Sequence, residues 1–319
     1  AKLGNGDWIV AEADESDGSF TMLPSTIGVI NNIDLEHLDF YKDINEIKDS
    51  FIKYAKNIPF YGFLSITIDD KNVKKIRDKI NHKQIYTYGF TKEANYYAEN
   101  LKIIKRKKQI FSCFDIVTNI YRKKVLKNVL IPMIGTHNVI NTLAAYSICK
   151  GLSVPNIKIK QALKQFRGVK RRFSVIYNYS ENMIIDDYAH HPKEIKTTLN
   201  ALRLITKKKL ITVFEPHRYT RIKEMREEFI NSFQNADVIF ILPVYGAGEK
   251  LIKKINNSEL SKLFKNKYKN KQIKPVDKTK ALYLEIKQII SNRDNVIFMG
   301  AGNSSKIANS IKELMEKNE

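Results

Sequence analysis

The sequence has 319 residues, and 43% of them are hydrophobic, so the chain can bury sizeable cores and is not intrinsically disordered. Its length predicts two domains. Lysine and arginine (55) outnumber aspartate and glutamate (34), but the basic residues are scattered along the chain, which favours a solvated surface and not a nucleic-acid groove. No apolar run approaches the ~20 residues of a membrane span, so we expect no membrane insertion.

The two cysteines, Cys113 and Cys149, have neither the number nor the spacing of a disulfide framework or a metal site. They indicate a reducing, cytoplasmic compartment. The first residue is Ala1 and not methionine, so we expect a processed or truncated chain.

The first half of the chain mixes strand and helix signals, with β-branched and aromatic runs between segments of helical periodicity. The expected elements are strands at 8–11, 63–68, 95–104, 109–117 and 124–134, and helices at 70–80, 137–150 and 156–166. The first of these strands is short and apolar, and we expect it to be buried.

After Gly168 strands and helices alternate regularly. Strands are expected at 183–186, 210–214, 238–242 and 296–299, and helices from Pro192, at 221–234, at 279–291 and from Ser304. This alternation predicts an α/β fold with a mostly parallel sheet covered on both faces. We place the domain boundary near 168–172, which gives domains 1–170 and 171–319. Ligands of such sheets bind beyond the carboxyl ends of the strands.

Four acidic residues within six positions, at 12–17, follow the first expected strand. Like charges at this density repel one another unless a cation or hydrogen-bond donors are near, and Mg²⁺ prefers such oxygen ligands. A solvated acidic turn is the alternative. His37 has acidic neighbours, which makes it a second candidate ligand, although a single histidine is more often structural.

Asn138 and Asn141 lie three residues apart at the start of an expected helix, next to His137. On one helical face their amides could contact a nucleobase edge, or they could form an ordinary polar surface.

Two polar clusters follow neighbouring expected strands. The first, at 186–192, contains two acids, a tyrosine and two histidines before a helix N-terminus, which attracts anions. The second, at 215–221, contains two arginines that can bind a carboxylate or a phosphate in bidentate fashion. Two such clusters at adjacent strand ends predict a ligand pocket. Gly300-Ala301-Gly302 lacks the third glycine of a dinucleotide-binding loop and is a poor indication of NAD binding.

Taken in this order, the motifs resemble those of the Mur ligases of bacterial cell-wall synthesis. The resemblance covers essentially the whole chain and rests on four stretches, at 11–20, 187–192, 216–221 and 300–303. It implies an incomplete central ATPase-type domain followed by a Rossmann-like C-terminal domain. The acidic signature at 11–20 is most similar to that of members that attach L-alanine to UDP-N-acetylmuramate. The resemblance therefore implies a magnesium-dependent, ATP-driven amide ligase of peptidoglycan synthesis, with those two molecules as its substrates.

The resemblance also implies roles for individual residues. Glu12 and His37 would bind Mg²⁺, and Arg172 and His190 would be the catalytic residues. The ATP-binding residues would be His137, Asn138, Asn141, Arg172 and Asp187. The residues around L-alanine would be Tyr188, His190, His217, Arg218 and Arg221, with His191 beside them. The family's Asp-His pair reads Glu36-His37 here, which keeps the negative charge.

The 319 residues contain no Gly-x-x-x-x-Gly-Lys-Ser/Thr loop, whose amides and lysine bind the triphosphate. In the family this loop and the UDP-binding domain precede the stretch that begins here. We therefore expect the 319-residue chain by itself to be inactive or nearly so.

Three other functions remain as alternatives. The first is a related ligase that attaches a recycled tripeptide to the same sugar nucleotide, whose acidic motif differs. The second is a non-catalytic basic binding protein, which would leave the clusters at 186–192 and 215–221 unexplained. The third is a nicotinamide dehydrogenase, disfavoured because no glycine fingerprint opens a βαβ unit.

Overall fold

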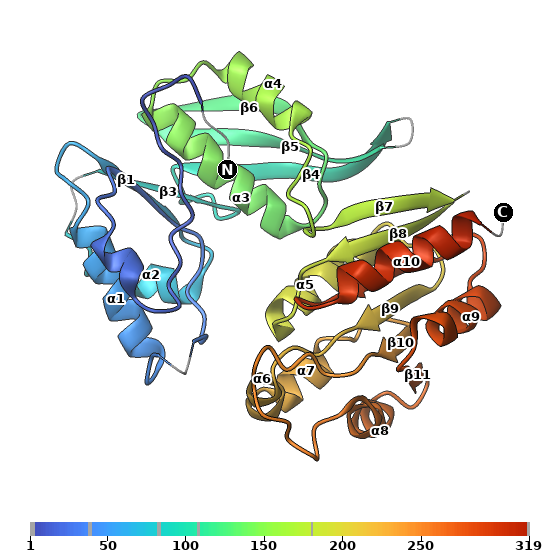
Figure 1. Cartoon of the computed structure of the whole chain (residues 1–319). Helices are drawn as coiled ribbons and strands as arrows, with labels where there is room; N and C mark the ends of the chain where they lie inside the picture. The colour runs from blue at the N-terminus through green and yellow to red at the C-terminus, as the bar shows by residue number, and fades with distance from the viewer. Residues whose placement is uncertain (1–3, 38–39, 82–83, 107–108, 180, 318–319) are drawn as a thin grey trace. The chain divides into compact units, whose positions relative to one another are not determined.

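The computed structural model describes residues 4–37, 40–81, 84–106, 109–179 and 181–317. The chain forms two compact units, which are coloured from blue to green and from green to red in Figure 1. The N-terminal unit comprises Ala1–Ile131 and His137–Gln165, and the C-terminal unit comprises Pro132–Thr136 and Phe166–Glu319. The main division, between Gln165 and Phe166, lies close to the boundary expected at 168–172.

The N-terminal unit is built on a six-stranded sheet in the order β1-β2-β3-β4-β5-β6. The strands up to β4 pair in parallel, and β4, β5 and β6 pair antiparallel. The strands are β1 (Ile27–Ile30), β2 (Phe63–Thr67), β3 (Ile85–Gly89), β4 (Tyr96–Arg106), β5 (Gln109–Ile120) and β6 (Arg122–Ile131). The strands expected at 63–68, 95–104, 109–117 and 124–134 are therefore confirmed with small shifts.

Four α-helices and one short 3₁₀ helix accompany this sheet (Figure 1). They are η1 (Ser19–Met22), α1 (Ile44–Lys56), α2 (Lys71–Arg77), α3 (Thr136–Gly151) and α4 (Asn156–Gln165). α1 and α2 bury their apolar faces against β1 and β2. Asp43 and Asp70 cap these two helices by accepting bonds from backbone amides of the first turn.

The prediction of a buried strand at 8–11 is wrong. Residues 8–11 have no regular secondary structure, and the side chains of Ile9 and Val10 are 93% and 97% exposed. A strand persists only where its backbone groups pair with a neighbour, and no described segment pairs with this one. An apolar run therefore did not suffice to make a strand here.

The C-terminal unit has a second six-stranded sheet, in the order β11-β10-β9-β12-β8-β7. All neighbours pair in parallel except β7 and β8, so the predicted mostly parallel sheet is confirmed. The strands are β7 (Ser174–Tyr179), β8 (Asn182–Asp187), β9 (Leu210–Phe214), β10 (Val238–Ile241), β11 (Gln272–Pro275) and β12 (Asn295–Met299).

Helices cover both faces of this sheet (Figure 1). The helices are α5 (Pro192–Arg203), α6 (Tyr219–Glu224), α7 (Arg226–Asn231), α8 (Asn257–Lys267), α9 (Thr279–Ile289) and α10 (Ser304–Glu316). One core lies under α5 to α8 and the other under α9 and α10. As expected from their spacing, Ile195, Leu199 and Leu202 of α5 are fully buried on one face.

The single helix expected at 221–234 is wrong in detail, because the segment forms α6 and α7. The backbone of Met225 leaves the helical region (φ −109°, ψ 31°) and separates them. Glu227 and Glu228 then lie in the first turn of α7, where negative charge is favourable.

Among the described helices, none is both long enough and apolar enough to cross a membrane.

Candidate functional site

Three strands of the C-terminal sheet end side by side, and each is followed by a polar segment. β12 lies between β8 and β9, with Met299 in register with both Asp187 and Phe214. The amide of Glu215 donates to the Met299 carbonyl (2.9 Å), and the amide of Gly300 donates to the Asp187 carbonyl (3.2 Å). The parallel topology therefore brings the polar clusters at 186–192 and 215–221 to one edge.

Asp187, the last residue of β8, is buried and holds two loop amides. Its Oδ2 accepts from the backbone N–H of Phe173 (2.7 Å), and its Oδ1 accepts from that of Ala189 (2.8 Å). Burial raises the pKa of Asp187 to about 6, although these amides and Arg172 favour the charged form. Asp187 thus connects the segment before β7 to the loop after β8.

Glu215, the residue after β9, is also buried, and its carboxylate lies at the start of α10. It accepts backbone N–H bonds from Gly302 (3.1 Å), Asn303 (2.9 Å) and Ser304 (2.9 Å). A helix N-terminus can bind a phosphate through such amides, but here the Glu215 carboxylate already accepts from them and would repel an anion. A Cβ on Gly302 would lie 2.9 Å from Glu215 Oε2, so this glycine serves close packing. The geometry therefore argues against a nucleotide phosphate at the start of α10, next to Gly300-Ala301-Gly302.

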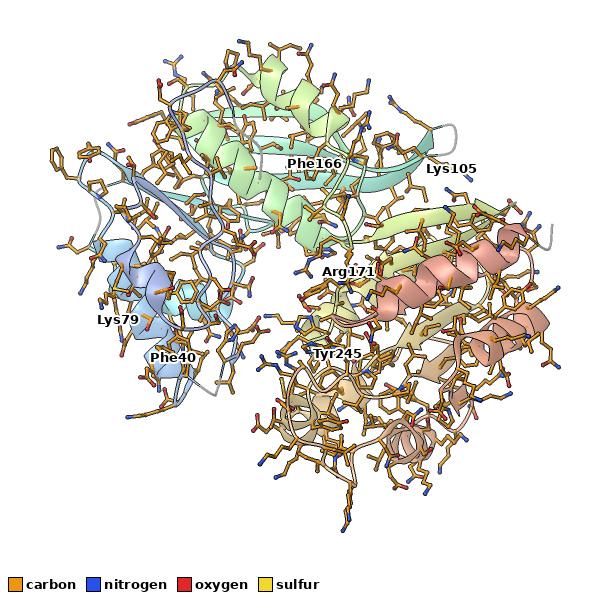
Figure 2. All side chains as sticks on the ribbon, in the orientation of Figure 1. Phe40, Lys79, Lys105, Phe166, Arg171 and Tyr245 are labelled. Atoms are coloured by element: carbon orange, nitrogen blue, oxygen red, sulfur yellow. The ribbon has the colours of Figure 1, made fainter. Side chains whose placement is uncertain are left out.

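Two arginines lie against the ring of Tyr188. The guanidinium carbon of Arg171 is 4.7 Å and that of Arg172 is 5.5 Å from the ring centroid, within cation–π range. Arg171 also donates to the carbonyl of Gly300 (2.8 Å), the residue that follows β12, so it lies at the same sheet edge. Arg171 and Tyr245 are both labelled in Figure 2. Arg172 instead pairs with Glu194 of α5 (3.0 Å) and remains half exposed.

His190 lies between Tyr188 and His217, with its ring edge-on to both at centroid distances of 5.1 and 5.3 Å. Its Nδ1 is 3.0 Å from the Tyr188 carbonyl. Because a carbonyl can only accept, Nδ1 carries the proton and Nε2 is left as the basic nitrogen. Burial lowers the pKa of His190, and Glu194 opposes the effect. His191 is buried at the residue before α5.

His217 stacks on Tyr245, with ring centroids 5.5 Å apart and planes at 13°. Its Nδ1 is 3.3 Å from a guanidinium nitrogen of Arg221, which can only donate, so Nδ1 accepts. Burial, His190 and the two arginines lower the pKa of His217 to about 4. Arg218 precedes α6 with φ +66° and is tied through its amide to the Tyr245 carbonyl (2.9 Å). The structure thus gathers neutral imidazoles and two guanidiniums at one sheet edge.

In the N-terminal unit, Glu15, Glu36 and His37 form a group that could hold a metal ion, with one ligand atom of each within 4.8 Å of the others. His37 Nε2 is 3.8 Å from both Glu15 Oε1 and Glu36 Oε2. Two carboxylates and one imidazole, all partly exposed, suit a hard divalent cation. Glu12 is exposed and does not belong to this group, so its role as a ligand stays a prediction.

His137, Asn138 and Asn141 lie in the first two turns of α3. The side-chain amide of Asn138 is 3.0 Å from His137 Nε2, and Asn141 is exposed. The shared face of the two asparagines follows from their spacing. Their contact with adenine stays a prediction.

Sequence reasoning missed three residues of these groups as functional candidates: Arg171, Glu194 and Tyr245. It did include Glu15 in the acidic cluster at 12–17 and noted Glu36 beside His37, but it assigned the ligand roles to Glu12 and His37. One of them had a detectable signal, because Glu194 follows His191 by three residues, the spacing of a capping box. Tyr245 had none, since it lies 28 positions after His217 and reaches it only through the fold.

Comparisons with known proteins agree on the relationship of both units. Residues 5–149 match the Mur ligase middle domain, and residues 171–302 match the Mur ligase glutamate ligase domain. The UDP-N-acetylmuramate–L-alanine ligase of Pelagibacter ubique is 39% identical over 99% of this chain and 68% of its own length. The chain spans about two thirds of the length of the curated relatives it matches.

Solved structures show the same fold. The UDP-N-acetylmuramate–alanine ligase of Thermotoga maritima superposes with a TM-score of 0.74 at 23% identity, covering 96% of this chain and 63% of that one. A second Thermotoga maritima ligase of the family, solved in complex with ADP, gives a TM-score of 0.69 at 16% identity over 95% of this chain and 66% of that one.

Proposed function

Because the chain belongs to the Mur ligase family, we propose that its protein joins L-alanine to the lactyl carboxylate of UDP-N-acetylmuramate in an ATP-dependent step of peptidoglycan synthesis. The observation that carries this proposal is the 39% identity to a ligase of that name across 99% of the chain. The tripeptide-attaching and nucleic-acid-binding alternatives have no comparable support.

The proposed reaction proceeds in two steps. The lactyl carboxylate attacks the γ-phosphorus of ATP, which releases ADP and leaves an acyl phosphate. The uncharged amine of alanine then attacks the acyl carbon, the tetrahedral intermediate releases phosphate, and the nitrogen loses a proton to give the amide. Activation is required because phosphate is a far better leaving group than oxide.

The C-terminal cluster has the chemistry to bind the amino acid. Arg218 and Arg221 would hold the alanine carboxylate, and guanidiniums suit this task because they bind it in bidentate fashion. Tyr188, His190 and His217 would surround the rest of the molecule. Since burial lowers the pKa of both histidines, neutral rings face the ammonium group without repelling it. The Nε2 of His190 could accept the proton that the amine must lose.

Five residues would bind the nucleotide. Arg172 would contact the phosphates, where a positive charge stabilises the transferring group. Asp187 would lie at the ribose or at a hinge, with its carboxylate held by the backbone amides of Phe173 and Ala189. His137, Asn138 and Asn141 would contact adenine through the exposed face of α3.

Mg²⁺ fits the residues at the N-terminal acidic cluster. Glu15, Glu36 and His37 would hold it, with Glu12 as a further ligand expected from sequence. The ion would neutralise charge on the phosphates of the nucleotide. We also propose that the protein works in the cytoplasm, where ATP is available and where Cys113 and Cys149 stay as free thiols.

The experiment is ATP-dependent phosphate release by the full-length protein encoded by the gene, with UDP-N-acetylmuramate and either L-alanine or a cell-wall tripeptide. We expect release with L-alanine and much less with the tripeptide. The 319-residue chain, measured in parallel, should be inactive, because it lacks the triphosphate-binding loop. Preference for the tripeptide would replace the proposal by the recycling alternative. Absence of phosphate release by the full-length protein with either L-alanine or the tripeptide would refute the proposed function.

A further inference from the structure

Glu194, in the first turn of α5, touches two separate loops of the candidate site. Its Oε2 accepts from the backbone N–H groups of His190 (3.1 Å) and His191 (3.3 Å). Its Oε1 accepts from the Arg172 guanidinium (3.0 Å). One carboxylate therefore joins the segment before β7 to the loop between β8 and α5.

The charge of Glu194 matters as well as its geometry. Burial alone would raise the pKa of this carboxyl, but His190 and Arg172 outweigh burial and hold it below its ordinary value. Glu194 is therefore ionised at neutral pH. The nearest contact between its Oε2 and His190 Nδ1 is 3.5 Å, so the negative charge also acts directly on the imidazole.

Contacts other than those with Glu194 do not by themselves hold the Arg172 side chain and the His190 loop in place. Arg172 is half exposed and lies 5.5 Å from the centroid of the Tyr188 ring, a contact with little directional preference. Its ion pair with Glu194 adds a directional restraint on a side chain that otherwise samples many rotamers. The His190 ring is oriented by the Tyr188 carbonyl, but the backbone of its own loop is held by Glu194. Loss of this carboxylate would release the arginine and loosen the loop together.

We propose that Glu194 is a positioning residue that sets Arg172 and His190 relative to each other, so that the phosphate-contacting and amino-acid-contacting groups form one rigid unit. The proposal rests on the proposed function for the roles of those two residues. It assigns Glu194 no contact with either substrate. Its effect is preorganisation, because a site already in its productive geometry loses less entropy on binding.

The test is Glu194→Gln in the full-length protein, with Glu259→Gln as a matched control. Glutamine keeps the length of the side chain and one acceptor oxygen for the backbone amides of His190 and His191, but it removes the charge. Glu259 occupies the same first-turn position of α8, where it pairs with Lys262 (2.7 Å) away from the site. We expect kcat/KM for both ATP and L-alanine to fall about tenfold or more in Glu194→Gln, and to change by less than about twofold in the control.

A second measurement separates positioning from a purely structural role. The imidazole of His190, followed by NMR in the 319-residue chain, should titrate at lower pH in Glu194→Gln than in the unsubstituted chain, because a neighbouring negative charge is lost. The control should leave this titration unchanged.

Two outcomes are distinguishable. If the unsubstituted full-length protein does not ligate L-alanine, the proposed function fails. If it does, and Glu194→Gln matches Glu259→Gln both in the two kcat/KM values and in the His190 titration, the role of Glu194 is refuted.

Discussion

The two groups of candidate residues are built in opposite ways. In the C-terminal unit, Asp187 and Glu215 are buried at strand ends, and every acceptor contact described for them is to a backbone amide. In the N-terminal unit, Glu15, Glu36 and His37 are partly exposed and lie on segments without regular structure, with two carboxylates 3.8 Å from one imidazole.

This difference indicates what each group depends on. The C-terminal edge is held by the protein itself, because backbone amides donate hydrogen bonds to its buried carboxyl groups before a ligand arrives. The carboxylates of the N-terminal group repel each other, so a cation should complete it. The C-terminal group should therefore be formed without ligand, whereas the N-terminal group should respond to metal.

The largest expected effect comes from removing the charge of Glu215. In Glu215→Gln, an amide nitrogen replaces one acceptor oxygen and faces buried N–H groups at the start of α10. We expect the C-terminal unit to lose about 3 kcal/mol of unfolding free energy, measured by hydrogen exchange of β9 and β12 amides. As a control, Glu285→Gln breaks the surface pair with Lys274 and should cost about 0.5 kcal/mol. Equal losses of unfolding free energy in the two variants would show that the hydrogen bonds of Glu215 stabilise the C-terminal unit no more than a surface ion pair does.

A smaller effect is expected from pH, through His217. The pKa of His217 falls from 6.5 to about 4 on folding, so the unfolded chain takes up a proton at higher pH than the folded chain. The free energy of unfolding therefore decreases as pH falls from 6.5 towards 4. Asp187, with its pKa raised from 3.8 to about 6, acts in the opposite direction and gains stability as pH falls through 6.

His217→Asn removes only the first of these two contributions. Between pH 7 and pH 5 the unsubstituted chain should therefore lose about 1 kcal/mol more than His217→Asn, after allowance for the partial exposure of the ring. Urea unfolding at several pH values measures this difference. Parallel stability curves for the two proteins would mean that His217 is not held neutral.

The smallest expected effect is that of Mg²⁺ on the N-terminal unit. At a concentration equal to its dissociation constant, Mg²⁺ should stabilise the unit by about 0.4 kcal/mol, seen as protection of amides near residue 15 in hydrogen exchange. Glu15→Gln should abolish this protection, and Glu12→Gln should reduce it less, because Glu12 lies outside the group of Glu15, Glu36 and His37. The reverse pattern would favour Glu12 as the ligand, and equal protection of the C-terminal unit would contradict the comparison.

Much of the fold could be predicted because the local signals are strong. The strand expected at 210–214 is found as Leu210–Phe214, and Pro192 opens α5 as expected. Weaker signals were missed, among them β1 and β11, which have four residues each. The run at 8–11 looked like a strand but found no partner, since pairing depends on segments far away in the sequence.

The sequence by itself determined that polar clusters at 186–192 and 215–221 would lie at one edge, because strand and helix alternation favours a parallel sheet whose strand ends share an edge. The expectation that the two strands are neighbours was wrong, since β12 lies between β8 and β9, and this order was decided by the tertiary structure. The tertiary structure decided which side chains face each other within that edge: Glu194 on Arg172, Tyr245 on His217, and Glu215 on the first turn of α10. It also brought Glu15, and not Glu12, to His37. Periodicity fixes the path of regular elements, whereas the direction of a side chain in a loop depends on contacts that no local pattern encodes.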